Sequence, residues 1–177
     1  MTTLKEYTKE AHTAAEKTEL AKAMLDGSVT EQQWAYVLYQ KMDIALSIEK
    51  KIFIPEEFSV VKHIAKDAGV FFEKYDYTIL GSTKQYSEHI ENSPAWLIDA
   101  DMYVNYLGDL YGGRFIHRAI TWQGKDHLDP PNRDERIDYI REKIKGRDKE
   151  LKEQALVSFE YNKKIYEEIF RYTKSVS

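Results

Sequence analysis

Apolar and small residues recur at helical spacing along most of the chain, and no stretch shows the strict alternation of an amphipathic strand. Thr3 and Glu6 form a capping-box pattern at the start of the first helix, and Gly27 follows it as a C-terminal cap. The first apolar stripe comprises Leu4, Tyr7, Ala11, Ala14, Ala15, Ala21 and Leu25; the second comprises Trp34, Val37, Leu38, Ile44, Ala45 and Ile48. This pattern predicts an all-α fold.

The remaining boundaries are marked by caps, glycines and prolines. Thr30 and Gln33 restart the helix after Gly27, and Pro55 ends that second helix. Shorter helices are expected over 56–91, broken near Gly69 and Gly81. A long helix is expected over 93–122, starting at Ser93-Pro94, then a loop over 124–131 and two helices over about 133–145 and 147–174. With no repeat or linker, we expect one domain over residues 1–177.

Composition excludes several classes of protein. The chain has no cysteine, which rules out disulfide scaffolds, zinc-thiolate and iron–sulfur sites, thiolate-ligated heme and covalent c-type heme. The net charge of −4 argues against a general nucleic-acid binder. No apolar run approaches the roughly 18–20 residues that span a bilayer. We therefore expect a soluble cytoplasmic protein without a nucleic-acid or membrane partner.

The segment 103–114 breaks helix rules inside an otherwise helical run. Gly108, Gly112 and Gly113 fall within six residues, and each interior glycine costs about 1 kcal/mol relative to alanine. Gly108 and Gly112 are four residues apart and share one face of the helix. Such a face either packs tightly against another helix or lets the backbone approach a flat ligand, with a kink opening the gap.

Asp109 lies among these glycines and near the apolar residues Leu107 and Leu110. A carboxylate in such surroundings is costly to bury unless it is hydrogen-bonded. It either caps a neighbouring element or holds an ordered water network beside a reacting centre.

Five histidines are candidate metal ligands: His12, His63, His89, His117 and His127. His12 has Glu16 four residues later, in place to accept a hydrogen bond from the ring and fix its orientation. His117 lies one turn beyond Gly113. The spacing alone does not choose among the five, and an exposed surface histidine is the simpler interpretation of any one of them.

Two segments together resemble the heme oxygenase family. Residues 4–16, LKEYTKEAHTAAE, are similar to its proximal helix and place the iron-ligating histidine at His12. Residues 103–113, YVNYLGDLYGG, are similar to its distal helix. The order and separation of the segments also agree, and the helical pattern agrees over essentially the whole chain.

The resemblance implies a function. Heme b, which is both substrate and cofactor, would lie between a proximal N-terminal helix and a kinked, glycine-rich distal helix that includes the catalytic positions Gly108, Asp109 and Gly112. Asp109 would organise distal water beside dioxygen at the iron, which His12 ligates. The products would be biliverdin, usually the IXα isomer, carbon monoxide and ferrous iron, formed with O2 and electrons. Expected partners are a ferredoxin and a downstream bilin reductase, and the enzyme is expected to be monomeric.

The resemblance also assigns further heme contacts. Lys5 and Arg141 match cationic positions for the propionates, with Lys9 and Arg136 as weaker candidates, and we expect Arg136 to lie on a solvated face. Other expected contacts are Glu16, Tyr103, Gly113, Phe159, Asn162 and Tyr166. Three residues depart from the family pattern: Asn105 stands where many members have arginine, Tyr111 replaces a smaller residue and Arg114 replaces glutamine.

Three other classes of protein are alternatives to this one. A heme-sequestering protein without turnover shares every binding feature and would differ in activity alone. A diiron oxidase needs paired Glu-x-x-His elements, but none of the five histidines has a glutamate three residues before it. A purely structural helical adaptor would leave the glycine cluster and Asp109 without a role.

Overall fold

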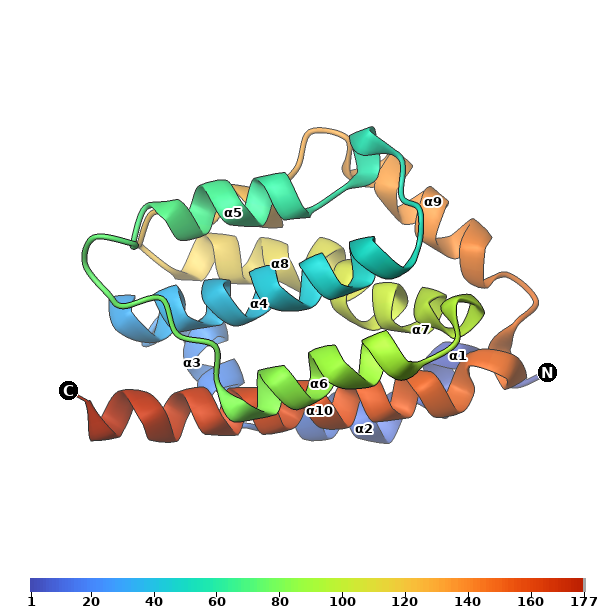
Figure 1. Ribbon diagram of the computed structural model, residues 1–177, viewed down its shortest axis with the longest axis horizontal. Coiled ribbons are helices and arrows are strands. Elements are labelled where there is room, and N and C mark those ends of the chain that lie inside the picture. The colour runs from blue at the N-terminus through green and yellow to red at the C-terminus, as the bar shows by residue number, and fades with distance from the viewer. Residues whose placement is uncertain (177) are drawn as a thin grey trace.

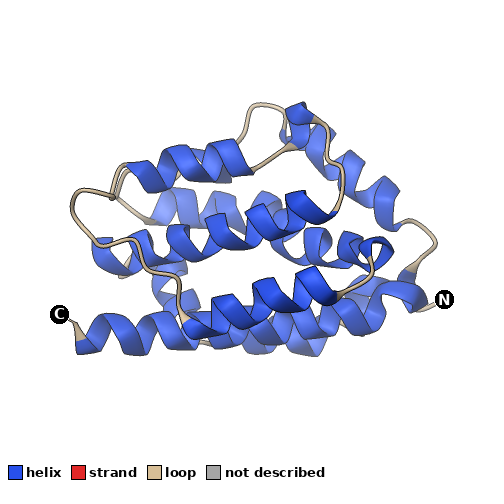
Figure 2. Cartoon of the chain, viewed as in Figure 1, coloured by secondary structure: helices blue, strands red, loops and turns tan. Residues whose placement is uncertain are grey.

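The computed structural model describes residues 1–176, which form helices and loops without a β-strand (Figures 1 and 2). The α-helices are α1 (Leu4–Tyr7), α2 (Lys9–Glu16), α3 (Glu19–Asp26), α4 (Glu31–Lys51), α5 (Val61–Gly69), α6 (Gly81–Asn92), α7 (Ile98–Met102), α8 (Gly108–Ala119), α9 (Arg133–Ile144) and α10 (Asp148–Ser175). Short 3-10 turns are η1 (Glu56–Phe58), η2 (Ala95–Leu97) and η4 (Asp126–Leu128), and η3 (Tyr103–Leu107) is a π-helical turn. The all-α prediction is confirmed.

The predicted helix caps are present. The Glu6 backbone N–H donates to the Thr3 side chain, and the Thr3 backbone N–H donates to the Glu6 carboxylate, both at 3.2 Å. Thr30 and Gln33 form the same reciprocal pair at the start of α4. Gly27 ends α3 with φ +82°, a conformation that L side chains rarely adopt.

The N-terminal helix is divided into three pieces, α1, α2 and α3, where the sequence predicted one. At the first break, the Thr8 hydroxyl donates to the Leu4 carbonyl oxygen at 2.9 Å. At the second, the Thr18 hydroxyl donates to the Ala15 carbonyl oxygen and accepts from the Ala21 N–H. Threonine side chains compete in this way with the backbone ladder. The breaks let α2 follow α10 while α3 contacts both α10 and α8.

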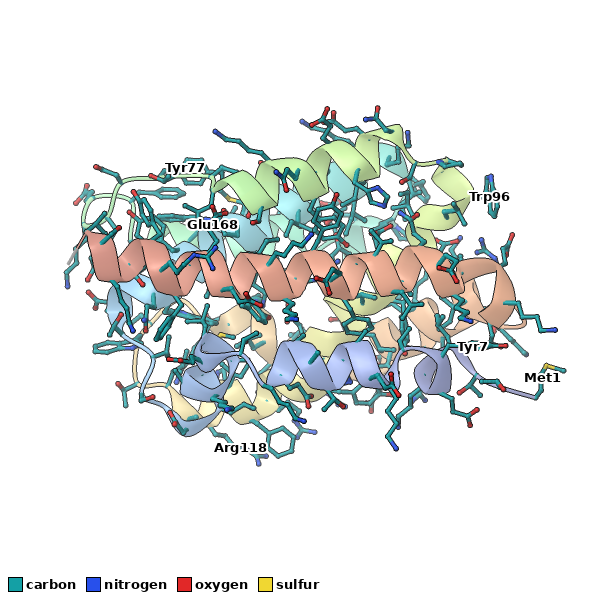
Figure 3. The ribbon with its side chains drawn as sticks, turned by 90° about the horizontal axis from the view of Figure 1, so that it is seen from below. Met1, Tyr7, Tyr77, Trp96, Arg118 and Glu168 are labelled. Atoms are coloured by element: carbon teal, nitrogen blue, oxygen red, sulfur yellow. The ribbon has the colours of Figure 1, made fainter. Side chains whose placement is uncertain are left out.

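Helix α4 runs through the middle of the molecule and packs against α5 and α6, while α10 contacts α2, α3, α4, α6 and α7 (Figure 1). Seen from below, α2 lies alongside α10, with Tyr7 toward the N-terminal end and Arg118 of α8 at the lower edge (Figure 3). Helix α8 packs against α3 and η4. The core between these layers buries large side chains completely, among them Trp34, Tyr39 and Tyr86.

The predicted long helix over 93–122 is interrupted and ends at Ala119. It consists of η2, α7, η3 and α8, and the π-helical turn η3 immediately precedes Gly108. Such a turn widens the helix and redirects the residues that follow it. The break in the α-helical backbone therefore lies immediately before the segment that contains Gly108, Gly112 and Gly113. Among residues 1–176, no helix is long and apolar enough to cross a membrane.

Candidate functional site

His12 stands on α2 with its side chain about half exposed (56%). Its Nε2 lies 2.8 Å from Oε1 of Glu16, one turn later, as the sequence predicted. Its ring is also 5.4 Å from the ring of Phe159 on α10. The carboxylate orients the imidazole through one ring nitrogen and leaves the other nitrogen for a metal.

The other four histidines differ in their surroundings. His127 is buried, and both of its ring nitrogens have polar neighbours. His63 lies 3.4 Å from Arg136, and His89 packs against the Tyr161 ring. His117 is half-buried in the last turn of α8. Only His12 and His63 are exposed among the five histidines, and the assignment of the iron ligand to His12 stays a prediction.

The glycines of α8 differ in their surroundings, and the difference bears on the two interpretations left open by the sequence. A Cβ atom on Gly108 or Gly112 would meet no atom of a neighbouring segment within 4 Å. A Cβ on Gly113 would lie 2.8 Å from Leu128 of η4. Tight packing thus explains Gly113, whereas Gly108 and Gly112 leave a stretch of backbone that faces open space.

Asp109 is paired with a cation from another helix. Its Oδ2 lies 2.8 Å from Nζ of Lys41 on α4, and its side chain is 27% exposed. Asp109 and His127 also line a cavity of about 30 Å³ with Tyr106 and Leu110. A cavity of this size holds a water molecule, and the role of Asp109 in organising water stays a prediction.

The Lys41 ammonium also contacts a buried His–Asp pair. His127 Nε2 lies 3.1 Å from Lys41 Nζ, and His127 Nδ1 lies 2.7 Å from Oδ2 of Asp67. Burial, followed by the charge of Lys41, lowers the pKa of His127. Burial alone would raise the pKa of Asp67, but the side-chain and backbone hydrogen bonds from His127 hold it below its usual value.

Asn105, one turn before Asp109, belongs to a separate network. Its side-chain N–H donates to the Tyr86 hydroxyl at 2.9 Å and to the Asp101 carbonyl oxygen at 2.8 Å. Its side-chain oxygen accepts from Asn162 at 3.1 Å. The carboxylate of Asp101 accepts in turn from Tyr86 and is fully buried. These bonds occupy Asn105 and direct it away from Asp109.

The predicted pocket residues border the same region. Tyr103 is half-buried in η3 beside Thr8, and burial raises its pKa. Tyr166 on α10 lies close enough to Asp109 for the carboxylate to add to the effect of burial, and both raise its pKa. Together with Phe159 and Asn162, described above, these side chains connect α10 to both the His12 side and the Asp109 side.

The predicted cations fall into two groups. Lys5, Lys9 and Arg141 are exposed, and Arg141 contacts the hydroxyl and the ring of Tyr111. Arg136 is only 5% exposed and donates to the carbonyl oxygens of Glu57, Phe58 and Ser59. The expectation of a solvated face for Arg136 was wrong, because its guanidinium satisfies the carbonyl groups around η1.

Sequence reasoning missed Lys41, Asp67 and the role of His127. One signal for Lys41 was present: it lies midway between Leu38 and Ala45 on the apolar stripe of α4, where a lysine needs a partner. The partner could not be found in this way, because Asp67 and His127 are 60 residues apart in the sequence.

Several known proteins are similar to this chain in sequence or in fold. Heme oxygenase of the fish Takifugu rubripes is 27% identical over 94% of this chain and 72% of its own length, and mouse heme oxygenase 2 is 28% identical over 94% and 64%. The crystal structure of heme oxygenase-1 from the cyanobacterium Synechocystis in complex with heme and the structure of heme oxygenase from Leptospira interrogans match with TM-scores of 0.83 and 0.77. They share 18% and 20% identity and cover 98% and 93% of this chain and 93% and 97% of their own.

These likenesses extend over nearly the whole chain and agree in fold. The heme oxygenase family model matches residues 1–172, which include α2, η3, α8 and nearly all of α10. The chain belongs to the heme oxygenase family.

Proposed function

We propose that this protein binds heme between α2 and α8 and cleaves the porphyrin ring to biliverdin, carbon monoxide and ferrous iron, using O2 and external electrons. The observation that carries the proposal is the open face at Gly108 and Gly112, because a macrocycle can approach the backbone there. His12 on α2 supplies an imidazole whose orientation Glu16 fixes.

The residues divide the work between the two sides of the heme. His12 would bind the iron, and Phe159 packs against its ring from α10. On the distal side, Asp109 would hold water beside the bound gas and supply protons through it. The iron and the porphyrin themselves supply the oxygen chemistry and the bond that is cut.

The propionates need cations at the edge of the pocket. The exposed residues Lys5 and Arg141 remain our candidates, with Lys9 as a weaker one. Arg136 is withdrawn as a candidate because its guanidinium is already bonded to backbone carbonyl groups.

The activity is tested with purified protein, stoichiometric hemin, a chemical reductant and catalase. We expect the heme absorption to disappear, biliverdin to form and carbon monoxide to be released. Chromatography of the product against the four biliverdin isomers then tests the expectation of the IXα isomer. Asp109→Asn serves as the matched variant, because it keeps the side-chain shape and removes the charge.

The competing function is heme sequestration without turnover. It predicts tight hemin binding with no biliverdin above that of a no-protein control, or turnover that catalase abolishes. Either result would replace the proposed oxygenase with a heme-binding protein of the same fold.

We also propose a small acidic ferredoxin as the electron donor. Arg114 and Arg118 are four residues apart on the exposed face of α8, and the Phe115 side chain between them is 62% exposed. A basic surface with an exposed aromatic ring suits a transient acidic partner. Arg118→Glu (labelled in Figure 3) should slow turnover driven by ferredoxin and leave turnover driven by a chemical reductant unchanged. Equal rates with ferredoxin would contradict this docking surface.

Three further predictions come from the resemblance alone: the enzyme is monomeric, it is cytoplasmic, and it passes biliverdin to a bilin reductase.

A further inference from the structure

We propose that Lys41, held in place by the buried pair His127–Asp67, is the positioning residue that orients the Asp109 carboxylate toward the heme site. The proposal rests on the proposed function and deepens it. It assigns a role in the reaction to three residues that lie on α4, α5 and η4, outside the two segments that resemble the family.

Lys41 lies on the apolar face of α4, and its side chain is only 20% exposed. A buried ammonium is costly unless acceptors surround it. The acceptors are Oδ2 of Asp109 at 2.8 Å and Nε2 of His127 at 3.1 Å. The ammonium therefore bridges a carboxylate on α8 and an imidazole in η4.

The Lys41 ammonium fixes the protonation of His127. A lysine ammonium offers donors and no acceptor, so His127 Nε2 must present its lone pair. The proton of the neutral ring then resides on Nδ1 and is donated to Asp67 at 2.7 Å. The lowered pKa of His127 agrees with a neutral ring at neutral pH.

The buried carboxylate of Asp67 holds His127 in place. Oδ2 of Asp67 also accepts the backbone N–H of His127 at 2.8 Å, so one carboxylate holds both the ring and the backbone. The ring stacks on Trp34 with centroids 6.3 Å apart. The charged groups that face it are Lys41 from α4, Asp67 from α5 and Asp109 from α8. Each ring nitrogen thus has one fixed partner.

Asn105 lies one helical turn before Asp109, but its side chain is committed to Tyr86, the Asp101 carbonyl group and Asn162. Lys41 contacts Oδ2 of Asp109, so Oδ1 is the oxygen that would accept a hydrogen bond from water in the reaction site. Loss of the cation would let the partly exposed carboxylate rotate away, which would disorder the water that it holds.

The test compares Lys41→Met, which keeps the length of the aliphatic stem, with Lys41→Arg, which keeps the charge. Lys50→Met is the matched control, because Lys50 lies on the same helix and is exposed. We expect Lys41→Met to lower kcat for heme turnover by about tenfold or more, as removal of an outer partner does in other metal sites. Hemin affinity should stay within about twofold, because Lys41 does not bind the substrate. Lys41→Arg should recover part of the rate.

A second readout uses the heme-free protein. Nitrogen-15 NMR should show His127 as the Nδ1–H tautomer in the wild type. In Lys41→Met, the Nδ1–H bond to Asp67 should persist, but the pKa of His127 should rise, because the charge of Lys41 is one cause of its lowering. Lys41→Gln serves as a second variant if Lys41→Met loses its cooperative melting transition.

The outcomes separate this proposal from the proposed function. If the wild type degrades heme and Asp109→Asn does not, while Lys41→Met keeps the wild-type kcat, the positioning role is wrong. A His127 ring protonated on Nε2 in the wild type would also overturn it. If the wild type binds hemin but forms no biliverdin, the oxygenase function fails and the positioning role fails with it, whatever the NMR spectra show.

Discussion

The two sides of the proposed heme site are built in different ways. On the proximal side, His12 and Glu16 lie one turn apart on α2, and both are 56% exposed. On the distal side, Asp109 is held by Lys41 and through it by His127 and Asp67, which are nearly completely buried. The proximal pair is local and accessible, as suits a ligand that must meet an incoming iron. The distal cluster is long-range and rigid, as suits a group that must stay in position during chemistry.

The largest effect should come from filling the open face of α8. Gly112→Leu places a side chain where a Cβ atom meets no neighbouring segment, so we expect normal folding but hemin affinity lower by about a hundredfold or more. Hemin titration followed by absorbance measures the affinity, and thermal melting of the heme-free protein checks the fold. Unchanged hemin affinity would show that the macrocycle does not lie against this backbone.

The next effect concerns the buried distal cluster. His127→Gln breaks hydrogen bonds to charged groups, and we expect the free energy of unfolding to fall by about 2 kcal/mol at neutral pH. The folded-state pKa of His127 is lowered from 6.5. The wild type should therefore lose stability as pH falls below about 6.5 toward the folded pKa, whereas the variant should show a flatter pH dependence.

Urea denaturation at several pH values between neutral and pH 5 measures both quantities. Asp67 should not dominate this window, because its pKa is lowered from 3.8 and its contribution is lost only at lower pH. Parallel pH profiles of the wild type and His127→Gln would contradict the neutral, buried histidine.

A smaller effect separates the two kinds of glycine on α8. Gly113→Ala places a methyl group 2.8 Å from Leu128, and we expect it to destabilise the fold by about 1 to 2 kcal/mol. Gly108→Ala is the matched control, because its Cβ atom faces open space and alanine is the better helix former. Denaturation of the heme-free proteins should give Gly108→Ala a higher free energy of unfolding than the wild type and Gly113→Ala a lower one. The reverse order would contradict the tight packing of Gly113 against Leu128.

The smallest effect should come from the proximal acceptor. Glu16→Gln keeps the length of the side chain and a carbonyl acceptor but removes the charge, so we expect hemin affinity to fall by about threefold to tenfold. The pair is solvent-exposed, which limits its contribution. Resonance Raman spectroscopy of the ferrous complex should show a weaker iron–histidine bond. An unaltered iron–histidine frequency would mean that Glu16 does not orient the ligand.

The same contrast explains what the sequence predicts and what it does not. Caps and apolar periodicity depend on neighbours within one turn, so α4, α9, α10 and the capping residues Thr3, Thr30 and Gln33 were predicted well. The breaks at Thr8 and Thr18 were not, because a threonine hydroxyl can either face solvent or replace the backbone ladder. The π-helical turn before Gly108 depends on tertiary packing and has no local signature.

In the candidate site, too, contacts within one helix were predicted and contacts between helices were not. The pairing of His12 with Glu16 was predicted because both residues belong to one helix. The ion pair between Lys41 and Asp109 was not, because it joins α4 to α8. The misassigned Arg136 is similar: its position on a charged helix suggested exposure, and only the fold shows the carbonyl groups of η1 around its guanidinium.

The central claim is that His12 is the iron ligand beneath the open glycine face, and the absorption spectrum of the hemin complex before and after His12→Ala tests it most directly. The wild type should give a six-coordinate ferric heme with imidazole and water as axial ligands, and the variant should lose the imidazole signature and regain it on addition of free imidazole. A spectrum that His12→Ala leaves unchanged would move the ligand to another histidine and contradict the account.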